Sequence, residues 1–199
     1  MSRAPFILVS LALLVSANPS FAEPVKYEID PAHSAAEFSV RHMMISDVKG
    51  AFSKVAGEIE YDEKNPQDSK VNATIDMSSI DTREPHRDEH LKTAPDFLDV
   101  AKYPTMTFTS KKVIAKGKGH LEVIGDLNLH GVTKEVTLDV DGPTPEITGG
   151  KRGASATTKI NRKDFGVTWN KSLDNGGVTV GDEVSITIDL EMKKPKVKA

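Results

Sequence analysis

The sequence contains no cysteine, which excludes disulfides and a thiol nucleophile. A chain of this size without disulfides must be held together by a hydrophobic core, so we expect a substantial sheet fold rather than a small disulfide-rich scaffold. The sequence also lacks a long apolar run. Its most apolar stretch, near the N-terminus, is broken by Ser16, Asn18 and Pro19, well short of the roughly 20 residues that span a bilayer. We therefore expect no transmembrane anchor.

The motifs of several functional classes are also absent. There is no G-x-S-x-G nucleophile elbow, and no glycine-rich loop joins a strand pattern to a helix pattern. Basic and aromatic residues are not clustered, so we expect no nucleic-acid partner. Carboxylates are plentiful, but they fall on the polar sides of strand patterns, where a solvated surface explains them. The sequence thus predicts neither an enzyme nor a cofactor.

The N-terminus has the pattern of a secretory signal peptide. Arg3 precedes an apolar stretch, and the small residues Ser20 and Ala22 follow it. We predict cleavage after Ala22, which gives a signal peptide over residues 1–22, one domain over 23–192 and a basic tail over 193–199. The tail, "KKPKVKA", has four lysines. We interpret it as solvated, with transient contact to a membrane surface as the alternative.

The dominant signal in the predicted domain has a period of two. Val25, Tyr27 and Ile29 alternate with charged residues, and the same alternation recurs in later segments. Turn signals such as "KGKG", "HG" and "DNGG" separate these segments at short intervals, which favours antiparallel hairpins over helical crossovers. Gly57 and Gly125 lie inside strand patterns, where a barrel wall needs bulges or tight bends. We therefore predict an all-β antiparallel barrel, with a sandwich as the alternative.

Only one region reads as helical, a short segment around residues 85–101. Pro85 suits the first helical position, and Pro95 disfavours helix at the residue before it. This segment contains His86, Glu89 and His90 in the order H-x-x-E-H of one metallopeptidase class. His86 and His90 could share a zinc ion, with Glu89 activating its water, but a catalytic zinc needs a third protein ligand that the sequence does not offer. The zinc-dependent hydrolase remains an alternative hypothesis.

Composition alone leaves open whether such a barrel is filled or hollow. Ala73, Ala154, Ala156 and Thr158 fall on the predicted inner faces, and small residues there leave room for a ligand. His42 is the polar member of the predicted face from Phe38 to Met44. It could meet a ligand headgroup or be a hydrogen-bonded core histidine. A filled barrel that binds a protein at its surface is the second alternative.

Four segments resemble the YceI-like family of bacterial periplasmic, polyisoprenoid-binding proteins. They are "YEIDPAHSAAEFSVRHMMISDVKGAF", "SSIDTREPHRDEHLKTAPDFLDVAKYPTMTFTS", "GDLNLHGVTKEVTLDV" and "KINRKDFGVTW". The resemblance implies an extended, lipocalin-like barrel in the periplasm that carries a long isoprenoid, an isoprenoid quinone or a similar lipid without catalysis. It also implies a homodimer as a candidate assembly. The resemblance also implies that His90 belongs to a recurrent motif of the family and that His86 does not.

Within this frame we predict which side chains bind the lipid. Phe97 and Leu98 are expected in the helical cover, and Trp169 at the rim or in the wall. The residues expected to line the interior are Phe38, Val40, His42, Met44, Ile75, Met77, Phe108, Leu127, Leu129, Leu138, Ala156 and Ile186.

Overall fold

The computed structural model describes residues 23–174 and 176–195. The predicted signal peptide and the last four residues of the predicted tail lie outside the described residues. The strands are β1 Val25–Ile29, β2 Ala35–His42, β3 Ser46–Phe52, β4 Val55–Tyr61, β5 Lys70–Asp76, β6 Ile80–Asp81, β7 Thr105–Gly117, β8 His120–Leu129, β9 Val132–Asp141, β10 Lys151–Asn161 and β11 Val180–Lys193. The helix α1 spans Pro85–Thr93, and the short 3-10 turns are η1 Pro66–Asp68, η2 Met77–Ser79 and η3 Arg162–Phe165.

Within the described residues, eight strands close into an antiparallel barrel. Their order around the wall is β1, β4, β5, β7, β8, β9, β10 and β11, and β11 pairs back with β1. The remaining strands β2, β3 and β6 extend the sheet from the free part of the β11 edge. The prediction of an antiparallel barrel with a short helical segment is therefore confirmed.

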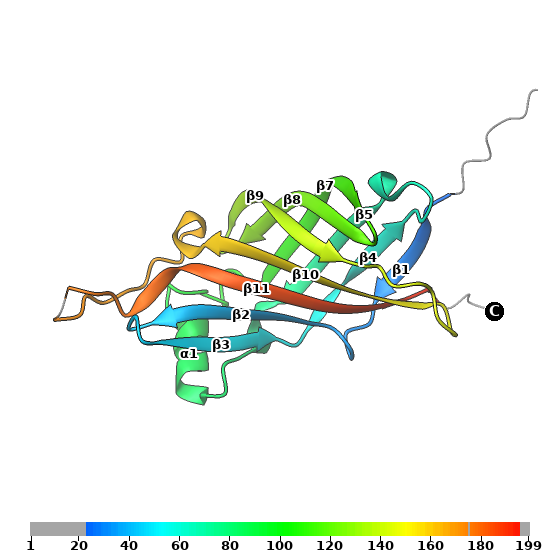
Figure 1. Ribbon diagram of the computed structural model, residues 1–199. Helices are drawn as coiled ribbons and strands as arrows, with labels where there is room; N and C mark the ends of the chain where they lie inside the picture. Colours follow the sequence, from blue (N-terminus) through cyan, green and yellow to red (C-terminus); the bar gives the residue numbers. More distant parts are fainter. Residues whose placement is uncertain (1–22, 175, 196–199) are drawn as a thin grey trace, which may run out of the picture.

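The two ends of this elongated barrel carry different structures (Figure 1). The β2–β3 turn, α1, η3 and the hairpin formed by residues 170–174 and 176–180 lie at one end, which we call the α1 end. Strand β1 and the C-terminal part of β11 lie at the other, which we call the β1 end. The inner faces of the wall strands connect the two.

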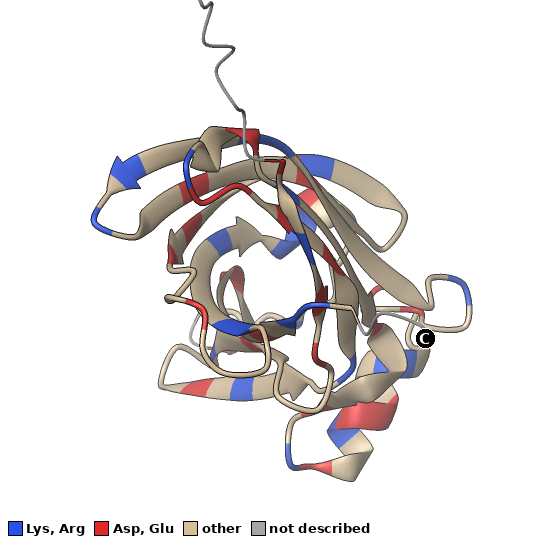
Figure 2. Cartoon of the chain, turned by 90° about the vertical axis from the view of Figure 1, so that its right-hand side faces the viewer, with Lys and Arg blue, Asp and Glu red and all other residues tan. Residues whose placement is uncertain are grey.

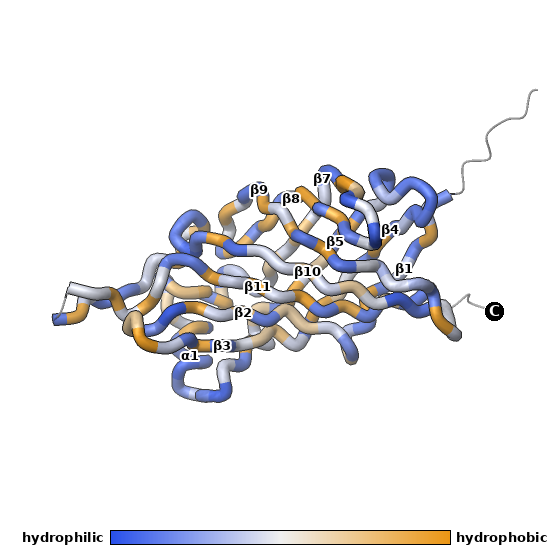
Figure 3. Tube along the Cα trace, viewed as in Figure 1, coloured by the Kyte–Doolittle hydropathy of each residue, from blue (hydrophilic) through white to orange (hydrophobic). Residues whose placement is uncertain are grey.

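The wall strands form where apolar and polar residues alternate, because successive side chains of a strand point to opposite faces of the sheet. Along β8, the buried Leu121, Val123, Leu127 and Leu129 alternate with partly exposed residues. The tube coloured by hydropathy in Figure 3 changes between orange and blue along several strands in the same way. Where β7 faces Gly125 of β8, its pairing shifts by one residue, which is the bulge predicted for a curved wall.

The helix α1 forms the first part of the predicted helical segment and, as predicted, ends before Pro95. The Glu84 side chain accepts hydrogen bonds from the backbone N–H groups of His86 and Arg87 and caps its start. At the other end Ala94 is already extended, with φ −73° and ψ 130°, because the ring of Pro95 disfavours helix in the residue before it. Residues 95–102 form turns instead of helix, and they carry Phe97 and Leu98 against the barrel.

A buried polar network closes the β1 end. The side chain of Arg152 is 6% exposed and donates to the Tyr27 hydroxyl at 3.0 Å, the Thr144 carbonyl at 2.9 Å and the Glu63 carboxylate at 2.7 Å. Burial by itself disfavours the charged guanidinium, but the hydrogen bonds to Tyr27 and Glu63 outweigh it and raise the pKa of Arg152. The Tyr27 hydroxyl in turn donates to Glu146 at 2.7 Å.

Charged residues of both signs are distributed over the strands, as Figure 2 shows in a view toward the β1 end. Many of them form exposed cross-strand ion pairs, for example Lys159 with Glu183 at 2.8 Å. Such pairs stabilise a fold only weakly. Among the described residues, no helix is long and apolar enough to cross a membrane.

Candidate ligand-binding cavity

The interior of the barrel holds an apolar cavity of about 390 Å³. This volume is within the range of roughly 300 to 1,000 Å³ that is typical of small-molecule sites. Every predicted site residue except Met44 lines it. Those that do are Phe38, Val40, His42, Ile75, Met77, Phe97, Leu98, Phe108, Leu127, Leu129, Leu138, Ala156, Trp169 and Ile186.

Met44 corrects the predicted inner face of the second strand. Strand β2 ends at His42, and Met44 lies in the following turn with a φ of 64° and 53% of its surface exposed. Alternation of side chains holds only while the backbone stays extended. Because the chain reverses at Met43 and Met44, the period-two pattern places Met44 on the wrong side.

Two glycines help to keep the interior hollow. A Cβ atom on Gly50 of β3 would lie 2.5 Å from the ring of Phe38, and one on Gly125 of β8 would lie 2.6 Å from the ring of Phe108. Both rings therefore lie against wall positions that lack a side chain. A side chain on either glycine would displace the ring that faces it, so the two glycines give these rings their space beside the cavity.

The charged and imidazole side chains of the lining are concentrated at the α1 end. Strand β2 ends there, η3 follows β10 there, and α1 lies there (Figure 1). Glu37 lies farther back along β2. The residues of this kind that line the cavity at the α1 end are Arg41, His42, Arg87, His90 and Arg162.

Arg162 is the most deeply buried of these cations. It is 4% exposed and donates to three backbone carbonyls, those of Gly181 and Val167 at 2.8 Å and of Val180 at 3.3 Å. Asp182 lies 3.5 Å from its guanidinium. Burial lowers the pKa of Arg162, although Asp182 opposes that shift. These bonds tie η3, the segment after it and the start of β11 together around the cavity.

Arg87 is held on the inner side of α1 by Thr82, which is 2% exposed. Its guanidinium donates to the hydroxyl and the carbonyl of Thr82, both at 2.8 Å. Asp88 accepts from the hydroxyl and the backbone N–H of Thr82, at 2.5 and 2.9 Å. This arrangement fixes a cationic side chain at the edge of an otherwise apolar cavity.

Three rings cover the cavity beside α1. The rings of Phe97 and Trp169 stack with centroids 4.8 Å apart, and the imidazole of His90 packs edge-on against them at 5.1 and 5.5 Å. The backbone N–H groups of Thr168 and Trp169 donate to the Asp96 carbonyl, each at 2.9 Å. The cover therefore joins two segments that are far apart in the chain.

The H-x-x-E-H motif does not form a three-ligand site. His86, Glu89 and His90 are all exposed on α1, and the ring of His90 also packs against Phe97 and Trp169. Within the described part of the chain, the group of three side chains that could hold a metal ion contains none of these residues. A catalytic zinc needs three protein ligands around one point, so the geometry of α1 does not support the hydrolase hypothesis.

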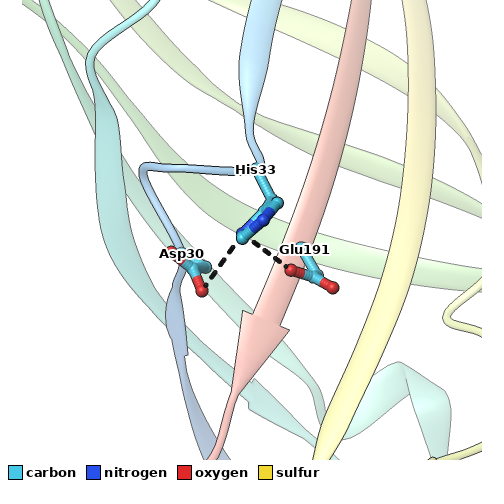
Figure 4. A group of neighbouring side chains, drawn as sticks. All are labelled: Asp30, His33 and Glu191. Carbon is cyan, nitrogen blue, oxygen red and sulfur yellow. Dashed lines mark ion pairs between the residues drawn. The ribbon is translucent and has the colours of Figure 1, made fainter.

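The group that does come together is Asp30, His33 and Glu191, on the outside of the β1 end (Figure 4). The His33 Nδ1 atom lies 3.5 Å from Asp30 and 3.1 Å from Glu191. Both carboxylates already have ammonium partners, since Lys193 lies 3.1 Å from Asp30 and Lys151 lies 3.3 Å from Glu191. The cluster is therefore an ion-pair network that joins the β1–β2 connection to β11.

The sequence reasoning missed several lining residues. Leu121 and Val123 belong to the same alternation as Leu127 and Leu129, but only the latter two were chosen as lipid-binding residues. Arg162 carries no such signal, because it lies in a 3-10 turn after the end of a strand. Its inward position depends on carbonyls from β11 and from the segment after η3.

Known proteins with this architecture share its fold along most of the chain. BcnA of Burkholderia cenocepacia superposes with a TM-score of 0.72 at 25% identity, covering 82% of this chain and 98% of its own. A polyisoprenoid binding domain from Saccharophagus degradans, implicated in plant cell wall breakdown, superposes with a TM-score of 0.64. It is 15% identical and covers 85% of this chain and 98% of its own. At that identity the likeness shows the fold alone.

Sequence similarity is closer and also runs along the whole domain. Protein YceI of Escherichia coli O157:H7 is 41% identical over 194 residues, which are 96% of this chain and 97% of that protein. The family model of the YceI-like domain matches residues 27–192, from Tyr27 of β1 to Met192 of β11. The resemblance found in the sequence is thus confirmed, and this chain belongs to the YceI-like family.

Proposed function

We propose that this protein is a non-catalytic carrier that holds a long apolar lipid, such as a polyisoprenoid or an isoprenoid quinone, inside its barrel. The observation that supports the proposal most directly is the apolar cavity that the barrel wall encloses. A filled barrel would offer only its surface to a partner, whereas this interior has room for a ligand. The polyisoprenoid binding domain with the same fold makes an isoprenoid the first probe to test, by analogy of fold.

The lining suggests how an amphiphile lies in the cavity. The middle of the wall is apolar, with side chains such as Leu138 and Ile186, while cationic and imidazole groups gather at the α1 end. An apolar chain gains by entering the dry interior, and a polar head loses less where it can find hydrogen-bond donors. The head therefore lies near Arg87 and His90, and the chain extends toward the β1 end.

The dimensions agree with a long chain. Strand β11 has 14 residues, and about 3.3 Å per residue gives a strand of roughly 46 Å, which runs obliquely to the barrel axis. Each buried methylene contributes about 0.8 kcal/mol in transfer free energy. Ordering a flexible chain offsets much of that sum, so binding can be firm and still reversible without a charged anchor deep in the cavity.

The compartment is part of the same proposal. The signal peptide predicted over residues 1–22 would deliver the domain to the periplasm, where a lipid that is insoluble in water needs a carrier between membranes. The absence of cysteine removes any need for disulfide formation there. Mass spectrometry of the intact protein from the periplasmic fraction tests this, since cleavage after Ala22 leaves Glu23 as the first residue.

Native mass spectrometry of gently purified protein tests the cargo directly. We expect one lipid per chain, released on activation and identified by its mass. Protein that retains no lipid and does not take up a fluorescent isoprenoid analogue would contradict the carrier. One zinc per chain without lipid would also contradict the carrier, and would make Asp30, His33 and Glu191 the first residues to test as its ligands.

A matched pair of substitutions on β11 locates the binding site. Ile186 lines the cavity, and its neighbour Thr187 is exposed on the outer face. Ile186→Trp fills part of the interior and should weaken binding of the fluorescent analogue at least tenfold. Thr187→Trp adds the same ring outside the wall and should leave the affinity unchanged. Equal affinities for the two variants would place the lipid outside the barrel.

A further inference from the structure

An exposed apolar turn lies at the α1 end. Three consecutive side chains between β2 and β3 are in contact with solvent: Met43 is 41% exposed, Met44 53% and Ile45 76%. Among the described residues, only Val25, Ile147 and Val178 are further large apolar side chains with this degree of exposure. Figure 3 shows this turn in orange at the tip of the β2–β3 hairpin. We call Met43, Met44 and Ile45 the apolar tip.

The backbone of the tip is unusual for these residues. Met43 and Met44 adopt φ values of 49° and 64°, in the left-handed region that asparagine and glycine tolerate best. Packing leaves much of their apolar surface uncovered, most of all at Ile45. Apolar residues therefore stand where turn chemistry favours polar or small ones, which indicates that their exposure serves a contact outside the molecule.

The apolar tip is continuous with the edge of the cavity. The N–H of Met43 donates to the Thr179 carbonyl at 2.7 Å, and His42, immediately before the tip, pairs with Val180 of β11. His42, Thr179 and Val180 all line the cavity. Val178, 38% exposed, is the next residue along the neighbouring hairpin. A surface that contacts the tip therefore lies beside the α1 end of the cavity.

The size and charge of the tip fit a lipid bilayer better than a protein. A stable protein interface buries about 800 Å² on each partner, which three side chains on a turn cannot supply. Insertion of a few apolar side chains between lipid headgroups has no such minimum. Arg41 precedes the tip by two residues, and Lys171 pairs with Thr179, which in turn pairs with Met43; both cations are exposed. Arg41 is 3.4 Å from Asp47, and anionic headgroups could compete for its charge.

We propose that the apolar tip docks the barrel on an anionic membrane surface, so that lipid enters and leaves through the α1 end. This inference rests on the carrier function proposed above and adds the place and the partner of loading. The docked end is opposite the end that holds Lys193 and Lys194 (Figure 1). The proposed docking surface therefore does not include these two lysines.

Vesicles of phosphatidylethanolamine and phosphatidylglycerol provide the test. The triple variant Met43→Ser, Met44→Ser, Ile45→Ser should sediment with these vesicles at least tenfold less than the parent protein. It should also transfer a fluorescent isoprenoid analogue between vesicles at least tenfold more slowly. Its equilibrium affinity for the analogue in solution should equal that of the parent, because the tip does not line the cavity.

A second variant controls for the general loss of apolar surface. Val25 and Ile147 are 40% and 61% exposed and lie in β1 and before β10. Val25→Ser, Ile147→Ser should leave vesicle binding and transfer unchanged. Equal vesicle binding by the parent and the tip variant would overturn the inference, as would a parent that does not bind vesicles. Failure of the parent to bind the analogue in solution would instead contradict the carrier function itself.

Discussion

The two ends of the barrel are built on opposite principles. At the β1 end Tyr27, Val55 and Met192 are each 1% exposed. Arg152 donates a hydrogen bond to the Tyr27 hydroxyl there. At the α1 end the inward side chains Val40, Val184 and Trp169 are only partly buried, and the apolar tip is in contact with solvent. The interior is therefore tightly packed near the β1 end, whereas inward side chains near the α1 end remain partly exposed.

This difference separates stability from binding within one wall. Along β2 the inward residues change from buried Ala36 to partly exposed Phe38 and Val40, so burial decreases along the strand toward the α1 end. Apolar surface left partly exposed contributes less to folding, but it remains available to a ligand. The same strand therefore contributes to the packed core at one end and to the partly exposed cavity lining toward the other.

The largest effect is expected from Arg152→Met at the β1 end. The substitution removes three hydrogen bonds and leaves the Tyr27 hydroxyl and the Thr144 carbonyl without this donor. We expect the free energy of unfolding to fall by roughly 3 to 5 kcal/mol, measured by urea denaturation. Lys159→Ala, in an exposed ion pair, is the control and should cost less than about 1 kcal/mol. Similar losses in both would show that the network does not close the barrel.

Two isoleucines sharpen the comparison further. Ile29 of β1 is 4% exposed and belongs to the buried cluster of the β1 end, whereas Ile186 of β11 is partly buried and faces the cavity. Ile29→Ala should cost about 3 kcal/mol of unfolding free energy. Ile186→Ala should cost about 1 kcal/mol and weaken binding of the isoprenoid analogue. Equal stability losses would mean that the interior is as tightly packed in the middle as at its end.

The inner faces could be predicted from sequence because the period of a strand is fixed. The expected lining residues Leu127 and Leu129 of β8, Leu138 of β9 and Ile186 of β11 all line the interior. The small inward residues Ala73, Ala154 and Ala156 also line the cavity. The position of α1 followed from its flanking prolines, which restrict the backbone whatever the tertiary context.

Other features depend on contacts that no local pattern records. Composition could not decide whether the interior is filled, because the answer depends on contacts between strands. One such contact is that of the Phe38 ring on β2 with Gly50 on the neighbouring β3. Arg152 meets Tyr27 and Glu63, which are 125 and 89 residues away in the chain. The turn at Met43 and Met44 was missed because its residues are not those that turn chemistry favours.

Acid should weaken the β1 end through Asp30. The hydrogen bond from Lys193 and then the backbone N–H of Ala32 lower the pKa of this carboxyl, although burial opposes them. Because the folded pKa lies below the unfolded value of about 3.9, the stabilisation is present above that value and is lost as the pH falls through the folded pKa. Asp30→Asn should therefore be less stable than the parent near neutral pH. The loss should be smaller than that of Arg152→Met or Ile29→Ala.

The measurement is urea denaturation of the parent and of Asp30→Asn between about pH 7 and about pH 2. The difference in unfolding free energy should shrink as the pH falls below the ordinary carboxyl range. Lys193→Met removes the partner at 3.1 Å and should lose the same pH-dependent part. A difference that stays constant over the whole pH range would rule out Asp30 as a source of acid sensitivity.

The smallest effect should have the opposite sign and lies at the α1 end. Met44 is 53% exposed at a φ of 64°, so Met44→Gly relieves strain without removing packing. We expect the free energy of unfolding to rise by about 0.5 kcal/mol, while vesicle binding falls.

Ile45→Gly is the matched control in the same turn. Its backbone is not left-handed, so stability should fall by roughly 0.5 to 1 kcal/mol, and vesicle binding should fall as well. Opposite changes in stability with the same loss of vesicle binding would show that the α1 end keeps Met44 for docking at the expense of stability. A loss of stability in both variants would instead mean that the turn is unstrained and that the contrast between the two ends does not extend to the backbone.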